Sequence, residues 1–177
     1  PYPTTKPDRH PALFAFAQSR LAGKRDLRIL SFGCSTGEEP IALAAWLPGA
    51  AIDAVDINPR NIAIARRKAK HLGLRTITFT TAARPVEQAA VYDAVFCLSV
   101  FRHGRLASEG PASCTAILPF AKFDAALAAI DQTIRPGGLL FIWGSNFHFG
   151  QSKVAAHYRP LAVAGMEPQA DAYYSPD

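Results

Sequence analysis

The sequence has little cysteine, no long apolar segment and no strong compositional bias. Its three cysteines, Cys34, Cys97 and Cys114, are an odd number without a C-x-x-C pair, which favours a reducing compartment and argues against a metal site. No apolar run approaches the ~18 residues that span a membrane, and no basic segment followed by an apolar one opens the chain. We therefore expect a cytoplasmic protein without a membrane partner or a bound metal.

The composition is that of an ordinary globular protein. Hydrophobic residues make up 49% of the 177 residues and charged residues 19%, which excludes collagen-like, disordered and disulfide-scaffold proteins. A domain usually has ~100–200 residues. We therefore expect residues 1–177 to form a single domain.

The net charge of +5 is concentrated in one basic run. Arg66, Arg67, Lys68, Lys70 and Arg75 could face nucleic acid or an acidic substrate. No aromatic residues are interleaved with these charges, so the pattern favours the other interpretation, a solvated helix face.

Five short apolar runs predict β-strands, because each is bounded by turn or helix-start signals. They are residues 27–32, 51–57, 76–81, 92–98 and 138–143. Helical patterns lie between several of them, and this alternation predicts an α/β fold with one doubly wound, mostly parallel sheet.

Three helices are predicted from their start signals and apolar spacing. The first has Pro40 in its first turn, the second opens at Asn58-Pro59 and ends at Gly73, and the third runs from Phe120 to Ile134 and ends at residues 136–138. The apolar faces expected of the first two are Ile41, Ala44, Ala45 and Leu47, and Ile62, Ala65, Ala69 and Leu72.

Two stretches interrupt the alternation. Residues 101–119 form a connection longer than compact folds use after a strand, and we interpret it as an inserted loop that serves as a lid or a substrate wall. Residues 158–163 fit an edge strand.

The turn after the first strand carries the functional argument, because ligands of doubly wound sheets bind beyond the carboxyl ends of the strands. The dinucleotide pattern G-x-G-x-x-G fails here, since alignment on Gly33 places Ser35 and Glu38 where glycines are needed. Glu38 and Glu39 at the mouth of the turn would repel a pyrophosphate and attract a cation.

Asp56 ends the second strand, nineteen residues after Gly37. At this spacing an acidic side chain can bind both hydroxyls of a ribose. A nucleoside with a cationic, amino-acid-like tail and no phosphates is S-adenosylmethionine. The structural alternative is that Glu38, Glu39 and Asp56 are capping carboxylates.

The chain resembles class I S-adenosylmethionine-dependent methyltransferases over residues 25–145. The similar segments are Phe-Gly-Cys-Ser-Thr-Gly at 32–37, Asp-Ile-Asn at 56–58, residues 92–100 and residues 134–142, and the run at 34–40 resembles the chemotaxis-receptor glutamate methyltransferases. The resemblance implies that Glu38 helps to hold the methionine amino group and that Asp56 holds the ribose. The remaining residues that it implies for cofactor binding are Gly33, Cys34, Ser35, Thr36, Gly37, Ile57, Asn58, Ala82, Ala83, Leu98, Ser99 and Val100.

Methyl transfer is an in-line displacement at a sulfonium, so alignment of the reactants supplies much of the rate enhancement. A base is needed only to take up the proton of the acceptor. His103, just past the fourth strand, is the first candidate for this base, and His148, past the fifth strand, is the second. The alternative for either residue is a hydrogen-bonded loop histidine. The aromatic residues that could line an acceptor pocket, or belong to the core, are Phe101, Trp143, Phe147 and Phe149.

Three functions fit these observations. The favoured one is a methyltransferase that acts on a small-molecule acceptor. The second is a methyltransferase acting on RNA or protein, including carboxyl methylation, and the third is a non-catalytic module that binds S-adenosylmethionine. Oligomeric state has no signature in the sequence.

Overall fold

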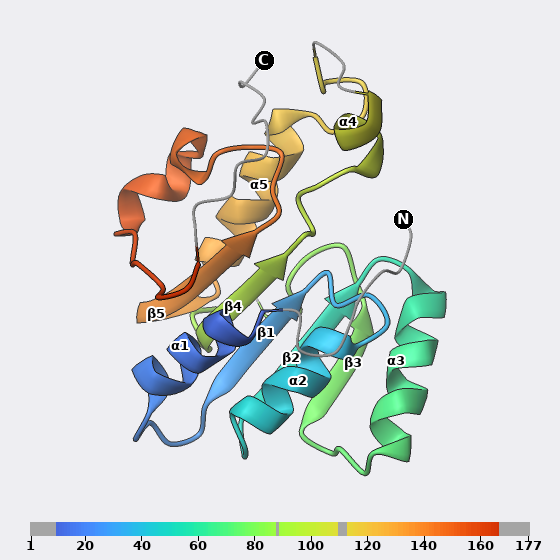
Figure 1. Ribbon diagram of the computed structural model, residues 1–177, viewed down its shortest axis with the longest axis vertical. Helices are drawn as coiled ribbons and strands as arrows, with labels where there is room; N and C mark the ends of the chain where they lie inside the picture. The colour runs from blue at the N-terminus through green and yellow to red at the C-terminus, as the bar shows by residue number, and fades with distance from the viewer. Residues whose placement is uncertain (1–9, 88, 110–112, 167–177) are drawn as a thin grey trace.

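The computed structural model describes residues 10–87, 89–109 and 113–166. Its centre is one five-stranded sheet in the order β3-β2-β1-β4-β5, in which every neighbouring pair is parallel (Figure 1). The strands are β1 Arg28–Phe32, β2 Ala51–Asp56, β3 Ile77–Thr81, β4 Tyr92–Leu98 and β5 Ile134–Trp143. The predicted α/β fold with a doubly wound parallel sheet is confirmed.

Helices cover both faces of the sheet. The helices are α1 Pro11–Leu21, α2 Glu38–Trp46, α3 Pro59–His71, α4 Gly104–Glu109 and α5 Phe120–Asp131, followed by the short 3-10 helices η1 Phe149–Gln151 and η2 Lys153–His157. Buried residues of α1, α2 and α3 belong to one core cluster, and those of α4, α5 and η2 belong to a second. The sheet therefore separates two hydrophobic cores. Because the cores cover its faces, a ligand site is expected at the ends of the strands.

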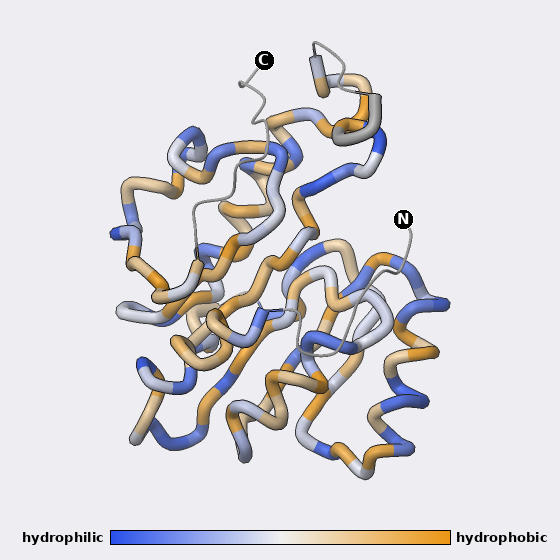
Figure 2. Tube along the Cα trace, in the orientation of Figure 1, coloured by the Kyte–Doolittle hydropathy of each residue, from blue (hydrophilic) through white to orange (hydrophobic). Residues whose placement is uncertain are grey.

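The two inner strands β1 and β4 have almost continuously apolar sequences because each is covered on both faces of the sheet. Ile29 packs into the core on the side of α1, whereas Leu30 packs into the core on the side of α5. A strand that is covered on both faces needs apolar side chains at odd and even positions alike. Figure 2 shows this sheet as a largely hydrophobic centre, while α3 at its edge alternates in hydropathy.

Helix α3 forms where its signals predict. The side chain of Asn58 accepts a hydrogen bond from the backbone N–H of Arg60 at 3.0 Å, and Pro59 occupies the first turn. Of its predicted apolar face, Ile62, Ala65 and Ala69 are buried. Leu72 is 56% exposed, so that part of the prediction is wrong: the helix ends before this residue turns inward.

The predicted face of α2 is also partly wrong. The helix begins at Glu38 and buries Pro40 and Leu43, whereas Ala45 is exposed. Leu47 is buried from the C-cap position. The apolar residues of this helix surround it on all sides, and sequence spacing therefore identifies its buried face poorly.

The predicted boundary between α5 and β5 is wrong. The helix ends at Asp131, and β5 begins at Ile134, so Pro136 and its two following glycines lie within the strand. The strand tolerates them through a register shift against β4 between Tyr92 and Ala94. Gly138 fits the irregularity, because a Cβ there would lie 2.9 Å from the carbonyl oxygen of Arg135.

Three further segments differ from the sequence-based expectations. Helix α1, which sequence analysis does not predict, buries Leu13, Phe14, Ala17 and Leu21. Residues 158–163 form no strand, and Val163 instead packs against the core on the side of α1. The stretch 101–119 contains α4, and Phe101 is buried in the second core; residues 110–112 of this stretch lie outside the described part.

Candidate functional site

The loops after β1, β2 and β3 meet at the carboxyl edge of the sheet. The backbone N–H groups of Gly33 and Cys34 both donate to the carbonyl oxygen of Val55 at 2.9 Å, and the N–H of Ala82 donates to that of Asp56 at 3.1 Å. Ala83 follows as an exposed residue. The structure therefore brings these predicted residues to one edge, where a doubly wound sheet binds its ligand.

Gly33 is required by the close approach of the loops after β1 and β4. Its φ is +79°, and a Cβ at this position would lie 2.5 Å from Cγ2 of Val100. Gly37, with φ of +92°, is similarly enclosed, because a Cβ would lie 2.8 Å from that of Ala65. The two glycines therefore let this loop pack closely against Val100 and Ala65.

Asp56 is the polar centre of the site. Its carboxylate accepts hydrogen bonds from the backbone N–H of Ser35 at 2.9 Å and from that of Asn58 at 2.8 Å. Its Oδ1 also accepts from the side chain of Asn61 at 3.4 Å. Asp56 thus has a structural role, as the capping alternative expects, while Oδ2, which accepts from Ser35, keeps a second lone pair for a ligand hydroxyl. Ile57 beside it is 72% exposed, which provides an apolar surface at the mouth of the site.

Negative charge gathers around the first loop. Thr36 donates to the carboxylate of Glu38 at 2.7 Å, and Ser31 donates to that of Glu39 at 2.7 Å. Burial and then the charges of Asp56, Glu39 and Glu38 raise the pKa of the Cys34 thiol. Cys34 therefore stays protonated at neutral pH, and the loop favours a cationic ligand over a phosphate.

Glu38 also forms an ion pair with Lys68 of α3. This pairing links the first loop to the next helix. Sequence analysis placed Lys68 only in a basic run, because nothing in the spacing of residues 38 and 68 identifies them as partners.

Ser99 lies where β4 ends, between the half-buried side chains of Leu98 and Val100. Its φ is +64°, and its hydroxyl oxygen is buried without a hydrogen-bond partner among the described residues. An unpaired buried hydroxyl costs free energy unless a ligand or water satisfies it. Its packing against Gly144, where a Cβ would lie 2.7 Å from the hydroxyl oxygen, fixes the oxygen at the ends of both strands.

Asn146 joins the loops after β4 and β5. Its backbone N–H donates to the carbonyl oxygen of Phe101 at 2.9 Å, and its side-chain oxygen accepts from the N–H of His103 at 2.8 Å. The residue is only 5% exposed. Sequence analysis did not single out Asn146, because only this tertiary contact distinguishes it from an ordinary loop asparagine.

The two candidate bases both use Nδ1 in local turns. Nδ1 of His103 accepts from the N–H of Arg105 at 3.4 Å, and Nδ1 of His148 accepts from that of Gly150 at 3.1 Å. Accordingly, the neutral rings carry their hydrogen on Nε2. In this arrangement Nε2 of each ring is a hydrogen-bond donor. Either ring can take up a proton only at Nδ1, and only after the hydrogen bond from Arg105 or Gly150 to that atom has broken.

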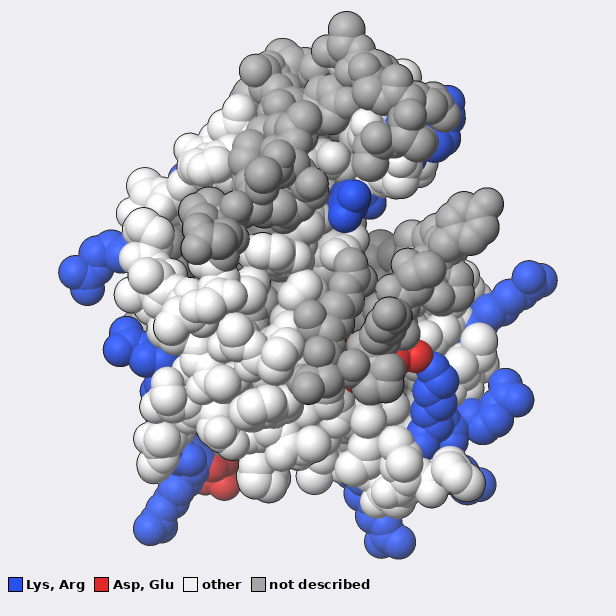
Figure 3. Space-filling model, in the orientation of Figure 1, with Lys and Arg blue, Asp and Glu red and all other residues white. Residues whose placement is uncertain are grey.

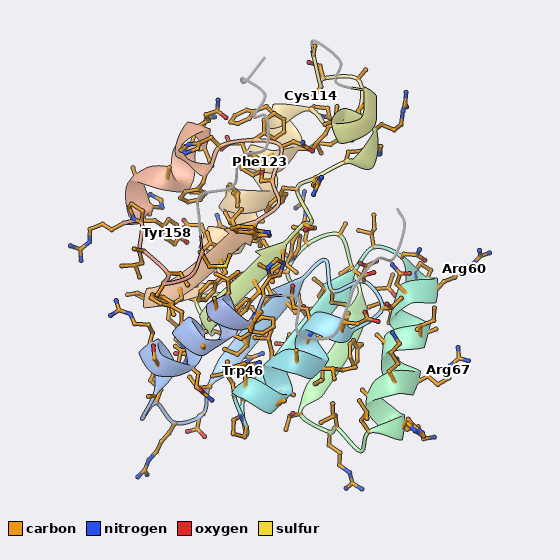
Figure 4. The ribbon with its side chains drawn as sticks, in the orientation of Figure 1. Trp46, Arg60, Arg67, Cys114, Phe123 and Tyr158 are labelled. Carbon is orange, nitrogen blue, oxygen red and sulfur yellow. The ribbon has the colours of Figure 1, made fainter. Side chains whose placement is uncertain are left out.

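The aromatic residues after β4 and β5 belong largely to the core. Phe101 and Phe147 are buried, and each packs against Phe123, with ring centroids 5.0 and 5.2 Å apart. Figure 4 labels Phe123 on α5. Trp143 and Phe149 are half-buried and pack against the two cores. The core interpretation therefore holds for Phe101 and Phe147.

These features fit S-adenosylmethionine. Asp56 has acceptor capacity for ribose hydroxyls, and the exposed Ile57 has the apolar surface that a base needs. Within residues 10–87, 89–109 and 113–166, no group of three or more His, Cys, Asp or Glu side chains could hold a metal ion.

The described helices include none that is long and apolar enough to cross a membrane.

Comparison with known proteins identifies the family. Residues 30–140 match the family described as "Methyltransferase domain". A "Ubiquinone biosynthesis O-methyltransferase" of Methylocella silvestris is 36% identical over 118 residues, which cover 65% of this chain and 38% of that protein. A "Demethylmenaquinone methyltransferase" of Thermus thermophilus is 31% identical over 121 residues, covering 67% of this chain and 47% of that protein.

A solved structure supports the fold. Coclaurine N-methyltransferase, bound to N-methylheliamine and SAH, superposes with a TM-score of 0.55 at 16% identity and covers 80% of this chain and 38% of that chain. The chain thus spans less than half the length of both curated relatives. The particular likeness of residues 34–40 to the receptor methyltransferases stays a prediction. With the family match over residues 30–140, the chain belongs to the methyltransferase domain family, as a class I domain whose cofactor is S-adenosylmethionine.

Proposed function

We propose that the chain methylates a small aromatic acceptor, specifically a ring hydroxyl of a quinol-type molecule. The observation that carries this proposal is the similarity, over the shared domain, to two enzymes named for ubiquinone biosynthesis and for demethylmenaquinone. Both names refer to quinones, whose reduced rings carry phenolic hydroxyls.

The residues proposed to hold the cofactor are those of the first loop together with Asp56, Ile57 and Ser99. Bound there, S-adenosylmethionine supplies an electrophilic methyl group on a sulfonium. Asp56 binds the ribose hydroxyls, while the backbone of residues 33–37 and the negative field of Glu38 and Glu39 favour the cationic tail.

The acceptor side is proposed to consist of the loops that Asn146 joins. Leu98 and Val100 supply apolar surface, and His103 lies on the loop that leaves β4. His103 can donate from Nε2 to the acceptor oxygen and so orient it. It can act as a base for the phenolic proton only in a second ring orientation, in which the 3.4 Å hydrogen bond from Arg105 has opened and Nδ1, in place of Nε2, faces the hydroxyl. His148, which caps η1, is the second candidate for this role.

The stretch 101–119 remains proposed as the wall over the acceptor. Phe101 and Leu106 anchor it in the second core, so only the surface between and beyond these anchors is available to cover a ligand.

Transfer of a labelled methyl group tests the proposal. The full chain would be incubated with methyl-labelled S-adenosylmethionine and, separately, a hydroquinone with a short isoprenoid side chain, total RNA, and a glutamate-rich peptide. We expect label in the hydroquinone, in an ether that resists mild base. Label in RNA, or a base-labile methyl ester in the peptide, would refute the small-molecule acceptor.

A further inference from the structure

Ser99 combines a strained backbone with an unused hydroxyl group at the end of β4. Its φ of +64° is left-handed, a conformation that a residue with a side chain adopts only at a cost. Its hydroxyl oxygen is buried and has no hydrogen-bond partner among the described residues, which is unfavourable as well. Strain and an unpaired polar group at one residue indicate a functional role.

The neighbouring strand holds Ser99 in this state. Leu98 is paired with Trp143 in the register of β4 and β5, and the N–H of Ser99 donates to the carbonyl oxygen of Trp143 at 2.6 Å. Gly144 leaves the space that the serine side chain fills, because a Cβ at Gly144 would lie 2.7 Å from the hydroxyl oxygen. The hydroxyl is therefore fixed between the ends of both strands.

The hydroxyl lies on the β5 side of the site and not on the side of the cofactor loop. The next residue, Val100, packs against Gly33, where a Cβ would lie 2.5 Å from Cγ2 of Val100. The hydroxyl of Ser99 instead contacts the loop after β5 at Gly144. It thus belongs to the two loops that are proposed to form the acceptor side.

These two loops present two hydrogen-bonding groups to an acceptor. Asn146 ties the loops together by accepting from the N–H of His103 at 2.8 Å. Because Nδ1 of His103 accepts from the N–H of Arg105, the neutral ring has its hydrogen on Nε2 and is a donor. The hydroxyl of Ser99 can donate or accept. Two such groups suit an acceptor with two oxygens better than one with a single oxygen.

The basic run of α3 lies in the other half of the molecule. Helix α3 packs on β2 and β3, which β1 separates from β4 and β5. Figure 3 shows Lys and Arg side chains on the right of the molecule, where Figure 1 places α3. A ring oxygen of a small acceptor therefore suits Ser99 better than a phosphate oxygen of a nucleic acid bound along that side.

We propose that Ser99 determines acceptor specificity: its hydroxyl binds a second ring oxygen of the acceptor, while His103 faces the hydroxyl that is methylated. This inference rests on the small aromatic acceptor proposed above. The backbone of Ser99 remains available to the cofactor, and only its hydroxyl is assigned to the acceptor. Because the hydroxyl oxygen is buried, the acceptor reaches it as the two loops adjust, and such hydrogen bonds often form fully only in the substrate complex.

The chemistry of the hydroxyl explains why it selects among acceptors. A site built to hydrogen-bond a substrate oxygen rejects the analogue that lacks it, because the polar group of the site then stays unpaired. An acceptor with the second oxygen pairs the hydroxyl of Ser99, whereas a simple phenol leaves it unpaired.

Methyl transfer to three matched acceptors tests the proposal on the full 177-residue chain. They are a catechol, a hydroquinone and a phenol with the same short isoprenoid side chain. For the wild type we expect kcat/KM of the better dihydroxy compound to exceed that of the phenol at least tenfold. In Ser99→Ala this preference should fall below about threefold, because only the dihydroxy compound loses a hydrogen bond. The comparison between wild type and variant cancels the intrinsic reactivities of the compounds.

Urea unfolding and cofactor binding separate this role from a structural one. Because the hydroxyl is unpaired among the described residues, Ser99→Ala should not lower the unfolding midpoint. Ser99→Gly should have a higher midpoint than Ser99→Ala, because glycine adopts this φ without strain. Both variants should bind S-adenosylhomocysteine within about twofold of the wild type, since the removed group faces the acceptor.

Thr133→Val is the matched control for loss of a buried hydroxyl. The hydroxyl of Thr133 donates to the carbonyl oxygen of Ile130 at 2.7 Å, and the residue is 1% exposed. Its loss should lower the unfolding midpoint. The preference among the three acceptors should stay that of the wild type, because Thr133 precedes β5 at the opposite edge of the sheet.

Several results would overturn the assignment of Ser99. Equal losses of kcat/KM toward all three acceptors would make it a residue that only shapes the loops, and a weakened affinity for S-adenosylhomocysteine would assign its hydroxyl to the cofactor. Equal rates of the wild type with phenol and dihydroxy compounds would refute this inference alone. No transfer to any of the three would refute the proposed function and this inference with it.

Discussion

Replacement of Asp56 by alanine separates the ligand-binding role of this carboxylate from its structural role. In the folded protein the carboxylate accepts two short backbone hydrogen bonds, from Ser35 and Asn58. Hydrogen bonds to charged groups contribute about 1.5–3 kcal/mol each when buried. Because Asp56 is half-exposed and water can replace the lost acceptor, we expect Asp56→Ala to lower the free energy of unfolding by only about 1–2 kcal/mol.

Besides this loss of stability, Asp56→Ala should remove the hydrogen bonds that the carboxylate would make to the ribose hydroxyls of the ligand. We expect the affinity for S-adenosylhomocysteine to fall by about 1–3 kcal/mol, or roughly five- to 150-fold. Asp56→Asn keeps one acceptor oxygen and should lie between the wild type and Asp56→Ala. Isothermal titration calorimetry measures the affinity, and urea unfolding measures the stability.

Asp53→Ala is the matched control on the same strand. Asp53 accepts hydrogen bonds from Arg28 at 2.8 Å and from the hydroxyl of Tyr92 at 2.9 Å. Its loss should lower stability while leaving cofactor affinity within twofold of the wild type. Unchanged affinity in Asp56→Ala, or an equal loss in Asp53→Ala, would refute a direct role of Asp56 in ribose binding.

Three further predictions concern the loops and the pH dependence. Gly33→Ala should lower the free energy of unfolding by about 2–4 kcal/mol, because its φ is left-handed and a Cβ would clash with Val100. Gly49→Ala, with φ of +86° but open space around it, should lower it by only about 1–2 kcal/mol, from the backbone conformation alone. Equal losses in urea unfolding would contradict this difference. Burial opposes ionisation of Asp93, but the N–H of Arg28 and the charges of Arg135 and Lys24 outweigh burial and lower the pKa of this carboxyl. Ionised Asp93 therefore stabilises the fold above the unfolded pKa of about 3.9. This stabilisation is lost as the pH falls through the folded pKa. Unfolding between pH 6 and 3 should therefore show a steeper loss of stability in the wild type than in Asp93→Asn, and parallel curves would exclude this contribution. His103→Asn keeps an acceptor for the N–H of Arg105 but removes both basic ring nitrogens. If the ring takes up the acceptor's proton, turnover should fall roughly 10²–10⁴-fold with cofactor affinity unchanged. A rise in KM alone would assign His103 to positioning.

Sequence patterns predicted β1 and β4 most clearly because these strands are buried on both faces. A short apolar run such as residues 94–98, bounded by turn signals, is typical of a strand that is covered on both faces. Asn58-Pro59 specifies a helix start through local hydrogen bonding. Boundaries failed where tertiary contacts decide them: Pro136 and its glycines indicate a helix end locally, yet the pairing with β4 extends the strand across them.

In the candidate site, too, some residues were predicted from the sequence, and some contacts depend on the tertiary fold. Gly33, Glu38 and Asp56 were predicted because their residue types and spacing follow from ligand chemistry at strand ends. The ion pair between Glu38 and Lys68 and the bridge of Asn146 to His103 join residues 30 and 43 positions apart. Such contacts leave no periodic signal, and the fold alone brings them together.

The binding preference for S-adenosylhomocysteine over NAD decides whether the loop after β1 holds a methionine-derived nucleoside. This loop lacks the phosphate-binding glycine pattern, and the carboxylates of Asp56, Glu38 and Glu39 surround it. Calorimetry of the full chain with each ligand should therefore show one molecule of S-adenosylhomocysteine bound per chain, at least tenfold tighter than NAD. Tighter binding of NAD, or no binding of S-adenosylhomocysteine, would contradict the account.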